Sequence, residues 1–357
     1  MIPYAVEPTA LWVVPVPDLG GVARHVLDVA RNGIPGWRLV ILCPPGPLAE
    51  ELRGLGAAVT TGPLGPDHGV AMSVATVRHA LRSLRPRVVH SHLSYADVVV
   101  GLATVGDPAA LITTEHGIAA DDLVYHGTPW RARLKAGVHA ARLRRVDALI
   151  AVSESTADVV RAKWRPGSGV VVRVILNGVD RLRPAPVRAP GLHICSLARL
   201  APEKRIDALL RAFALVHAEH PQARLTVAGR GPLESELKGL TADLGLTDAV
   251  DFPGHVDPAA LLAEADVLAQ LSVWENASYS LLDAVVHGLG VVATPVGGNP
   301  EILAAHLLVS ADDPAGVARA LVTQGLEPMT RPPLLDGWPS VRDMTTQIGS
   351  VYRAVAP

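Results

Sequence analysis

Short apolar runs rich in Val, Ile and Leu alternate along the chain with longer stretches in which apolar residues recur at helical spacing. Such alternation predicts parallel sheets assembled from strand–helix–strand units. The expected strands of the first half are Ala10–Val16, Arg38–Leu42, Val88–His90, Leu111–Thr114, Ala148–Val152 and Val171–Leu176. Those of the second half are His193–Leu197, Arg224–Ala228, Val250–Phe252, Val267–Leu271 and Val291–Thr294.

Helix-like segments separate these strands. The clearest are Ala23–Ala30, Val70–Leu84, Arg131–Arg145, Ile206–Glu219, Leu233–Leu244, Ser278–His287 and Pro314–Thr323. Because these segments alternate with the strands, each half of the chain is expected to form an α/β domain of the Rossmann-like kind. A last helix over Val341–Val355 is expected to cross back to the first domain.

A proline-rich segment separates the two halves. Residues Arg181–Pro190 contain three prolines and no hydrophobic period, which indicates a linker. A chain of 357 residues is long enough for two domains. The expected domains are therefore residues 1–182 and residues 183–340, followed by the C-terminal helix within residues 341–357.

Composition and charge narrow the class of protein. Apolar residues make up 49% and charged residues 18% of the chain, which is typical of a folded protein rather than a disordered one. The net charge of −2 gives no reason to expect nucleic acid as a partner. No apolar run reaches the roughly 18–20 residues that span a bilayer. The first residues also lack the basic and apolar segments of a signal peptide, so the expected location is the cytoplasm.

Cysteine and lysine are both scarce. Cys43 and Cys195 lie far apart in apolar strand-like segments, so two buried free thiols are expected rather than a disulfide. Only four of the 32 basic residues are lysines, and the other 28 are arginines. A lysine in such a chain is a better candidate for a chemical role than a lysine in an average protein.

The first candidate site is the segment from Gly20 to His25. It follows the first strand and opens a helix, and paired glycines there allow a ligand to approach the backbone closely. A plain tight turn is the simpler alternative. The segment lacks the Gly-x-Gly-x-x-Gly pattern, which disfavours a dinucleotide cofactor.

Histidines stand at the ends of two other strands of the first half. His90 ends one expected strand and His92 comes two residues later, while His116 follows another strand just before a glycine. Ligands of open α/β sheets bind at the carboxyl ends of the strands, so these side chains are placed for a substrate pocket. Structural histidines are the alternative for each. A zinc site of His90, His92 and His116 is possible by ligand type, but no Cys ligand or HExxH motif accompanies them.

Two cations flank a loop in the second half. Arg199 and Lys204 lie between a strand and a helix, at the carboxyl edge of the expected sheet. Fixed cations at such a position can stabilise negative charge that develops on a bound phosphate group. Arg can grip a phosphate with two hydrogen bonds, whereas Lys acts as a point charge.

Two carboxylates lie eight positions apart near the end of the chain. Glu275 precedes an expected helix N-terminus, where Ser278 is placed to cap the helix, and Asp283 lies within the helix. Helix N-termini attract phosphate because their N–H groups point outwards at the positive end of the dipole. The pattern is therefore suited to a phosphorylated sugar.

These segments together resemble retaining glycosyltransferases of family 4, which have the GT-B architecture of two Rossmann-like domains facing across a cleft. The likeness extends from Gly20 to the C-terminal helix, and the motifs come in the order typical of the family. They are Gly20-Gly21-x-x-x-His25-Val, His90-x-His92, Thr114-x-His116-Gly, Asn177-Gly-Val-Asp180, Arg199-Leu-x-x-x-Lys204 and Glu275-x7-Asp283.

The resemblance implies a role for each matched residue. The residues implied at the reacting sugar and the leaving phosphate are His116, Arg199, Lys204 and Glu275. Those implied in binding the donor are Gly20, Gly21, Gly229, Val256, Ser278, Tyr279, Ser280 and Asp283. His25 and His92 would bind the acceptor. No metal or other cofactor is implied, because Arg199, Lys204 and helix N–H groups would do what Mg²⁺ does in other transferases.

The implied activity is transfer of a hexosyl group, with retention, from a nucleoside-diphosphate sugar, with UDP favoured on prevalence. The acceptor would be a hydroxyl of a small molecule, a natural product or a lipid-linked compound. The chain departs from the family pattern at Asp283, where Glu is usual, and at Asn276–Ser278, where Gly-Phe-Gly is usual. Two alternatives stay open: a nucleotide-sugar epimerase or a phosphorylase on the same fold, and a weakly catalytic partner subunit. The oligomeric state is open as well.

One basic segment stands outside these motifs. Residues Trp130–Arg145 carry six Lys and Arg residues and no acid. A solvated basic face is the expected interpretation. Weak contact with a membrane surface and binding of a negatively charged acceptor are the alternatives.

Overall fold

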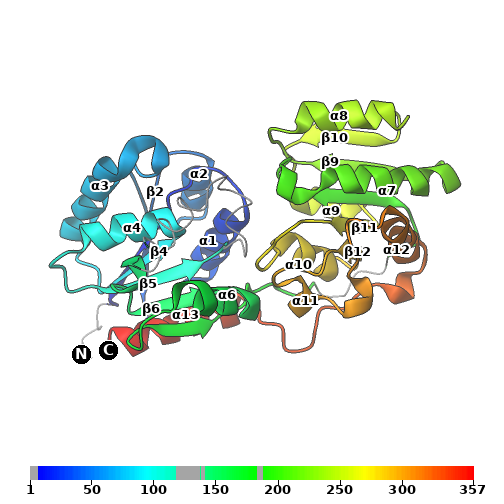
Figure 1. The fold of residues 1–357 in the computed structure, drawn as a ribbon. Coiled ribbons are helices and arrows are strands. Elements are labelled where there is room, and N and C mark those ends of the chain that lie inside the picture. Colours follow the sequence, from blue (N-terminus) through cyan, green and yellow to red (C-terminus); the bar gives the residue numbers. More distant parts are fainter. Residues whose placement is uncertain (1–6, 118–136, 138–140, 183–187) are drawn as a thin grey trace. The chain divides into compact units, whose positions relative to one another are not determined.

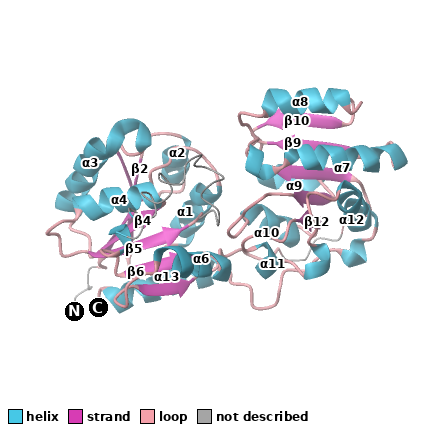
Figure 2. Cartoon of the chain, viewed as in Figure 1, coloured by secondary structure: helices cyan, strands magenta, loops and turns pink. Residues whose placement is uncertain are grey.

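The computed structural model describes residues 7–117, 137, 141–182 and 188–357 and divides the chain into two compact units (Figure 1). Unit 1 contains residues up to Gly178 together with Pro339–Pro357, and unit 2 contains Val179–Trp338. The break therefore falls a few residues before the proline-rich segment, half of which lies outside the described residues. Each unit has a parallel sheet with helices on both of its faces (Figure 2).

The sheet of unit 1 has seven parallel strands in the order β3-β2-β1-β4-β5-β6-β7. The strands are β1 Thr9–Val13, β2 Arg38–Cys43, β3 Val59–Thr61, β4 Val88–His92, β5 Ala110–Glu115, β6 Ala148–Ala151 and β7 Val171–Val174. The described helices of this unit are α1 Gly21–Asn32, α2 Pro47–Gly54, α3 Gly69–Leu84, α4 Ser94–Ala103, α6 Glu154–Trp164 and α13 Val341–Val355.

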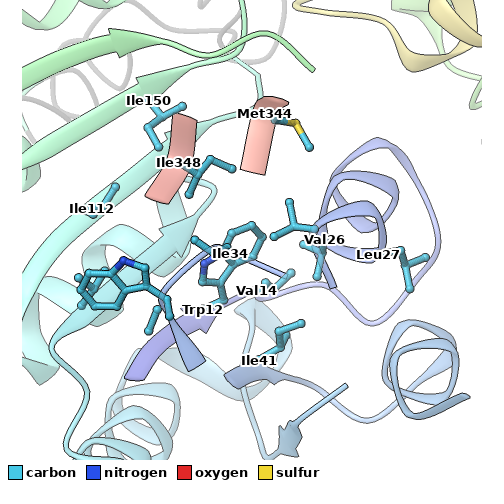
Figure 3. Close-up of a cluster of buried hydrophobic side chains, with 14 of the residues drawn as sticks. Trp12, Val14, Val26, Leu27, Ile34, Ile41, Ile112, Ile150, Met344 and Ile348 are labelled. Carbon is cyan, nitrogen blue, oxygen red and sulfur yellow. The ribbon is translucent and has the colours of Figure 1, made fainter. Parts of the chain in front are cut away.

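Side chains of alternate strand positions fill two layers of core. Trp12, Ile41 and Ile112 pack on one face of the sheet against α1, α2 and α13. Figure 3 shows Met344 and Ile348 of α13 in this layer, beside Trp12 and Val26. Leu11, Val13, Leu42 and their neighbours pack on the other face against α3 and α4, and α6 covers β6 and β7. The last helix thus completes the core of unit 1.

The sheet of unit 2 has five parallel strands in the order β10-β9-β8-β11-β12. The strands are β8 His193–Leu197, β9 Arg224–Ala228, β10 Val250–Gly254, β11 Val267–Gln270 and β12 Gly290–Ala293. One face packs against α7 Ile206–Glu219, α8 Glu234–Asp243 and α12 Pro314–Leu326. The other packs against α9 Pro258–Glu264, α10 Tyr279–Val286 and α11 Asn299–Ile302.

The fold class predicted from the sequence is confirmed, and the strands β8 and β9 have the predicted bounds. The sequence reading missed β3 and the helices α2, α4, α6, α9 and α11, which are short or have weak apolar periodicity. The expected helix over 131–145 lies largely outside the described residues.

Three further sequence expectations can be compared with the described residues. Cys43 and Cys195 are buried free thiols, as expected, and burial raises the pKa of Cys43 to about 11 and that of Cys195 to about 12. Arg142 contradicts the expected solvated basic face, because its guanidinium is buried against Asp97 and Glu115. Among the described residues, no helix has both the length and the apolar character needed to cross a membrane.

Candidate active site

The loop after β1 places Gly20 and Gly21 on the surface of unit 1. Gly20 is the N-cap of α1 and has extended backbone angles that any residue can adopt. A Cβ atom added at either glycine would meet nothing within 4 Å. The fold of unit 1 therefore does not require glycine at these two positions, which leaves ligand approach as a reason for them.

The ends of β4, β5 and helix α1 bring three histidine side chains together. His25 comes from α1, His92 ends β4, and His116 directly follows β5. The ring centres of His25 and His116 are 4.9 Å apart, and those of His92 and His116 are 5.2 Å apart. His25 and His92 are buried, whereas His116 is half-buried. We call His25, His92 and His116 the histidine group.

Burial keeps the histidine group neutral. It lowers the pKa of His25 to about 4, although a hydrogen bond with the Asn177 side chain acts in the opposite direction. Burial also lowers the pKa values of His92 and His116 well below the ordinary value, and the nearby histidines lower them further. Neutral imidazoles offer one N–H and one lone pair each, so they suit hydrogen bonding to sugar hydroxyls.

The distance between the His92 and His116 nitrogens fits a hydrogen bond better than it fits two ligands of one metal ion. One nitrogen from each of the three rings lies within 4.8 Å of the others, so the ligand types would suit a metal. However, His92 Nδ1 and His116 Nε2 are only 2.8 Å apart. Two nitrogens bound to zinc at about 2.0–2.1 Å in tetrahedral geometry would stand about 3.3 Å apart. The zinc set considered from the sequence also included His90, whose two nitrogens bind Tyr352 and Thr114 instead.

A second layer of aromatic residues lies beneath the histidine group. Trp12 is opposite His90 in the register of β1 and β4, and its ring centre lies 4.3 Å from that of His92. Trp12 Nε1 donates to the Tyr352 hydroxyl at 2.6 Å, and that hydroxyl lies 2.6 Å from His90 Nδ1. Burial raises the pKa of Tyr352 far above its ordinary value, so the hydroxyl keeps its proton.

The donor and the acceptor of each hydrogen bond in this second layer can be assigned. Because Trp12 can only donate, the Tyr352 oxygen accepts from it and the Tyr352 proton is directed to His90 Nδ1. His90 then carries its proton on Nε2 and donates to Thr114 Oγ1 at 2.7 Å. The chain of bonds links α13 to the ends of β4 and β5, where His92 and His116 lie.

A buried ion-pair network supports the same strand ends from the other face. Arg142 contacts both Asp97 of α4 and Glu115, the last residue of β5. Burial raises the pKa of Glu115 to about 7, while the charge of Arg142 acts to lower it. Asp97 also accepts a hydrogen bond from Thr113 at 2.7 Å. The network fixes the backbone directly before His116.

Unit 2 holds the two cations predicted from the sequence at the carboxyl end of β8. Lys204 Nζ forms an ion pair with Glu275, and Ser272 Oγ donates to the same carboxylate oxygen at 2.8 Å. Arg199 forms an ion pair with Glu203. The Arg199 side chain is 63% exposed and therefore accessible, whereas that of Glu203 is 7% exposed. We call Arg199 and Lys204 the cation pair.

The carboxylate of Glu203 was missed in the sequence reading. Burial acts to raise its pKa, but hydrogen bonds from its own backbone and from Arg199, with the charges of Arg199 and Lys204, lower the pKa below its usual range. The carbonyl of Glu203 also accepts from the N–H of Val273 at 2.8 Å. Glu203 thus ties the loop that carries the cation pair to the loop that carries Glu275.

Two glycines let these loops approach one another. Gly229 has φ +133°, and a Cβ atom there would lie 1.9 Å from the carbonyl oxygen of Ala198, next to Arg199. Gly297 has φ +53°, and its Cβ atom would lie 1.6 Å from the carbonyl oxygen of Glu275. Both positions need glycine for backbone packing, so the local fold explains Gly229 without any ligand.

The N-terminus of α10 lies next along the chain. Ser278 caps it as predicted, because its side chain accepts from the Leu281 N–H at 3.3 Å. Gln270, at the buried end of β11, donates to the same hydroxyl at 2.7 Å. Tyr279 and Ser280 form the first turn, and Asp283 lies half-buried in the second turn. Val256 is a half-buried residue in the loop after β10.

Comparison with known proteins covers most of the chain. A sequence model described as Glycosyltransferase Family 4 matches residues 19–183, and one described as Glycosyl transferases group 1 matches residues 191–324. The chain belongs to glycosyltransferase family 4. The predicted resemblance is thereby confirmed, and the two family matches correspond closely to the two units.

Relatives of this family 4 member include enzymes of several pathways. A glycogen synthase of Mycobacterium tuberculosis is 29% identical over 81% of this chain and 78% of its own length. A putative colanic acid biosynthesis glycosyltransferase of Escherichia coli is 28% identical over 59% and 54%. HepE of Anabaena, solved with UDP-glucose, has a TM-score of 0.75 at 18% identity and covers 98% of this chain and 95% of that chain. This likeness shows that the fold is GT-B.

Each unit therefore assembles its own part of the predicted site. Unit 1 brings His25, His92 and His116 together, and unit 2 pairs Lys204 with Glu275 and Arg199 with Glu203. The sequence reading missed Trp12, Tyr352 and Glu203, which are buried partners of the predicted residues. No motif marks Tyr352, although a polar ring on the apolar stripe of α13 is a weak signal.

Proposed function

We propose that this glycosyltransferase transfers a hexosyl group, with retention, from a nucleoside-diphosphate sugar to an acceptor hydroxyl. UDP is the proposed nucleotide, supported by the UDP and UDP-glucose complexes of HepE. Unit 2 is proposed to bind the nucleotide and unit 1 the acceptor. The acceptor class is a small molecule, a natural product or a lipid-linked compound.

The observation that carries this proposal is the ion pair of Lys204 with Glu275 just before the N-terminus of α10, with Arg199 on the same loop as Lys204. Lys204 is 19% exposed and contacts Glu275, which lies three residues before the helix cap. A phosphate placed there would meet a lysine charge, an arginine fork and the positive end of a helix dipole. These groups stabilise a departing diphosphate as its negative charge develops.

The remaining residues are assigned to the sugar and the nucleotide. Glu275 is proposed to accept hydrogen bonds from hydroxyls of the transferred sugar, and Asp283 from the nucleotide ribose. His116 is proposed to contact the sugar near the reacting carbon. In the proposed reaction the acceptor oxygen attacks on the face from which the diphosphate leaves, and the leaving phosphate takes the acceptor proton. A product with the anomeric configuration of the donor, seen by NMR, supports this step, and an inverted product contradicts it.

We propose that no metal is needed, because the cation pair supplies the positive charge. Enzyme treated with EDTA is expected to keep its full rate. A rate lost with EDTA and restored by Mg²⁺ would show that the cation pair is insufficient.

Replacement of Lys204 tests the proposal directly. Lys204→Ala is expected to lower kcat by about 10²–10³, the usual effect of removing one group that stabilises developing charge. Lys238→Ala is the matched control, since Lys238 lies in the same unit and pairs with Glu234 on the exposed surface. UDP release with a panel of acceptors measures both. Equal rates for the two variants would refute the assignment.

A further inference from the structure

Within the histidine group, His92 and His116 form a closely defined pair. His92 Nδ1 and His116 Nε2 lie 2.8 Å apart, and the ring centres lie 5.2 Å apart. The distance between the ring centres exceeds the distance between the two nitrogens by nearly the sum of the two ring radii. The nitrogens therefore face each other along the line between the rings, which is the geometry of a single N–H···N hydrogen bond.

Burial decides which histidine donates. His92 Nε2 is fully buried and has no hydrogen-bond partner among the described residues. If the proton of the neutral His92 ring were on Nε2, a buried N–H would be unsatisfied. An unsatisfied lone pair is the less costly alternative, because orphaned donors are rarer in proteins than under-satisfied acceptors. The His92 proton is therefore on Nδ1, where it is donated to His116.

The ring of His92 is also held in place. Trp12 packs at 4.3 Å and the His90 ring stacks at 4.5 Å between centres. His90 is itself fixed by its bonds to Tyr352 and Thr114. His92 is 0% exposed and cannot meet a ligand without rearrangement, whereas His116 is half-buried.

We infer that His92 is a positioning residue that fixes the tautomer of His116. By donating to His116 Nε2, it leaves the His116 proton on Nδ1, so that this nitrogen presents an N–H to an oxygen of the substrate. The role of His92 is then to orient His116, in place of the acceptor contact expected from the sequence. The substrate part of this inference rests on the proposed function, but the tautomer does not.

The tautomer can be measured without any activity. Long-range ¹H–¹⁵N NMR of the histidine-labelled full chain distinguishes protonated from unprotonated ring nitrogens, and the spectrum of His116→Asn assigns the His116 signals. We expect His116 to be protonated on Nδ1 and His92 on Nδ1. A His116 ring protonated on Nε2, or on both nitrogens, would overturn the inference whatever the protein catalyses.

Two variants of His92 connect the tautomer to turnover. The amide of His92→Asn can place an N–H near the position of Nδ1, whereas His92→Leu has no donor. We expect His92→Leu to lower kcat/KM for the donor by about tenfold, the effect of losing one oriented hydrogen bond, with the acceptor KM unchanged. His92→Asn should recover most of this loss.

Three outcomes separate the possibilities. A raised acceptor KM with unchanged donor kcat/KM in His92→Leu would place His92 at the acceptor and overturn the inference. Equal losses in both variants would do the same. If the wild-type protein transfers no sugar at all, the proposed function fails, while the NMR result still decides the tautomer.

Discussion

Tyr352→Phe is the sharpest test of the layer beneath the histidine group. The substitution removes one oxygen atom and keeps the ring, which packs edge-on against Trp37 at 5.2 Å between centres. It deletes the 2.6 Å bond from Trp12 Nε1 and the 2.6 Å bond to His90 Nδ1. Trp12, His90 and Tyr352 are all 0% exposed, so water has no direct access to the two abandoned groups.

The size of the effect follows from this burial. An unsatisfied buried donor or acceptor costs about 1–3 kcal/mol, and two such groups are created. Some relaxation is expected, so we expect unit 1 to lose about 2–4 kcal/mol of unfolding free energy. Tyr95→Phe is the matched control in the same unit. Its hydroxyl donates to the Gly65 carbonyl at 2.9 Å and contacts Ser73 at 3.0 Å, but Tyr95 is half-buried. We expect that variant to lose about 1 kcal/mol.

Hydrogen exchange in a urea series, read by mass spectrometry on peptides of β1 and β4, measures the opening of unit 1 separately from unit 2. This separation matters because a chain with two units need not unfold in one step. If Tyr352→Phe costs no more than Tyr95→Phe, the hydrogen-bond chain from Trp12 to His90 does not stabilise the fold, and the directional assignment of its protons is wrong.

Three further predictions concern acid, glycine and the nucleotide. Because folding lowers the pKa of His25 from 6.5 to about 4, only the unfolded chain gains this proton in that range. His25 should therefore lower the unfolding free energy of unit 1 by about 1.4 kcal/mol for each pH unit as the pH falls from about 6.5 towards 4. Urea unfolding of the wild type and of His25→Phe across this pH range measures the contribution of His25. The raised pKa of Glu115 has the opposite effect on stability, but four histidines have lowered pKa values and outweigh it. Stability of unit 1 that rises as the pH falls would contradict the prediction. Gly20→Ala should leave thermal stability unchanged while raising the KM of a substrate. Gly229→Ala should destabilise unit 2, because its Cβ atom would collide with the Ala198 carbonyl oxygen. A Gly229→Ala variant as stable as the wild type would show that this position does not need glycine. Asp283→Glu should change the donor KM and retain transfer, as initial rates across donor concentrations would show.

Much of the architecture could be predicted from the sequence because it depends on local patterns. The runs of β8 and β9 each begin with a polar residue, His193 or Arg224, and an arginine follows two residues after each run, so their limits could be predicted. The short edge strand β3, with only three residues, has too little pattern to be recognised. Arg142 shows a different limit. Its sequence neighbours are basic, but its partners Asp97 and Glu115 come from distant segments, so its burial could not be predicted from the local charge pattern.

The candidate site shows the same division between the residues proposed to carry the chemistry and the residues that hold them. His116, Arg199 and Lys204 could be found because they follow strands in recognisable patterns. Their partners could not. Tyr352 binds Trp12 and His90, which are distant in the sequence, and a glutamate in a loop such as Glu203 is normally exposed.

The substitutions at the N-terminus of α10 illustrate how a departure from a pattern can be accommodated by a second residue. Ser278 occupies a position where the family pattern has glycine. The structure uses its hydroxyl to cap the helix, and Gln270 of β11 binds the same oxygen at 2.7 Å. A polar residue at the buried end of a strand is costly unless it is bonded, so Gln270 depends on Ser278 as much as Ser278 is held by it. The two residues should therefore be coupled. Ser278→Gly alone would leave the Gln270 amide without this partner, whereas the double change with Gln270→Leu would remove both polar groups. A double variant less stable than Ser278→Gly alone would contradict this coupling.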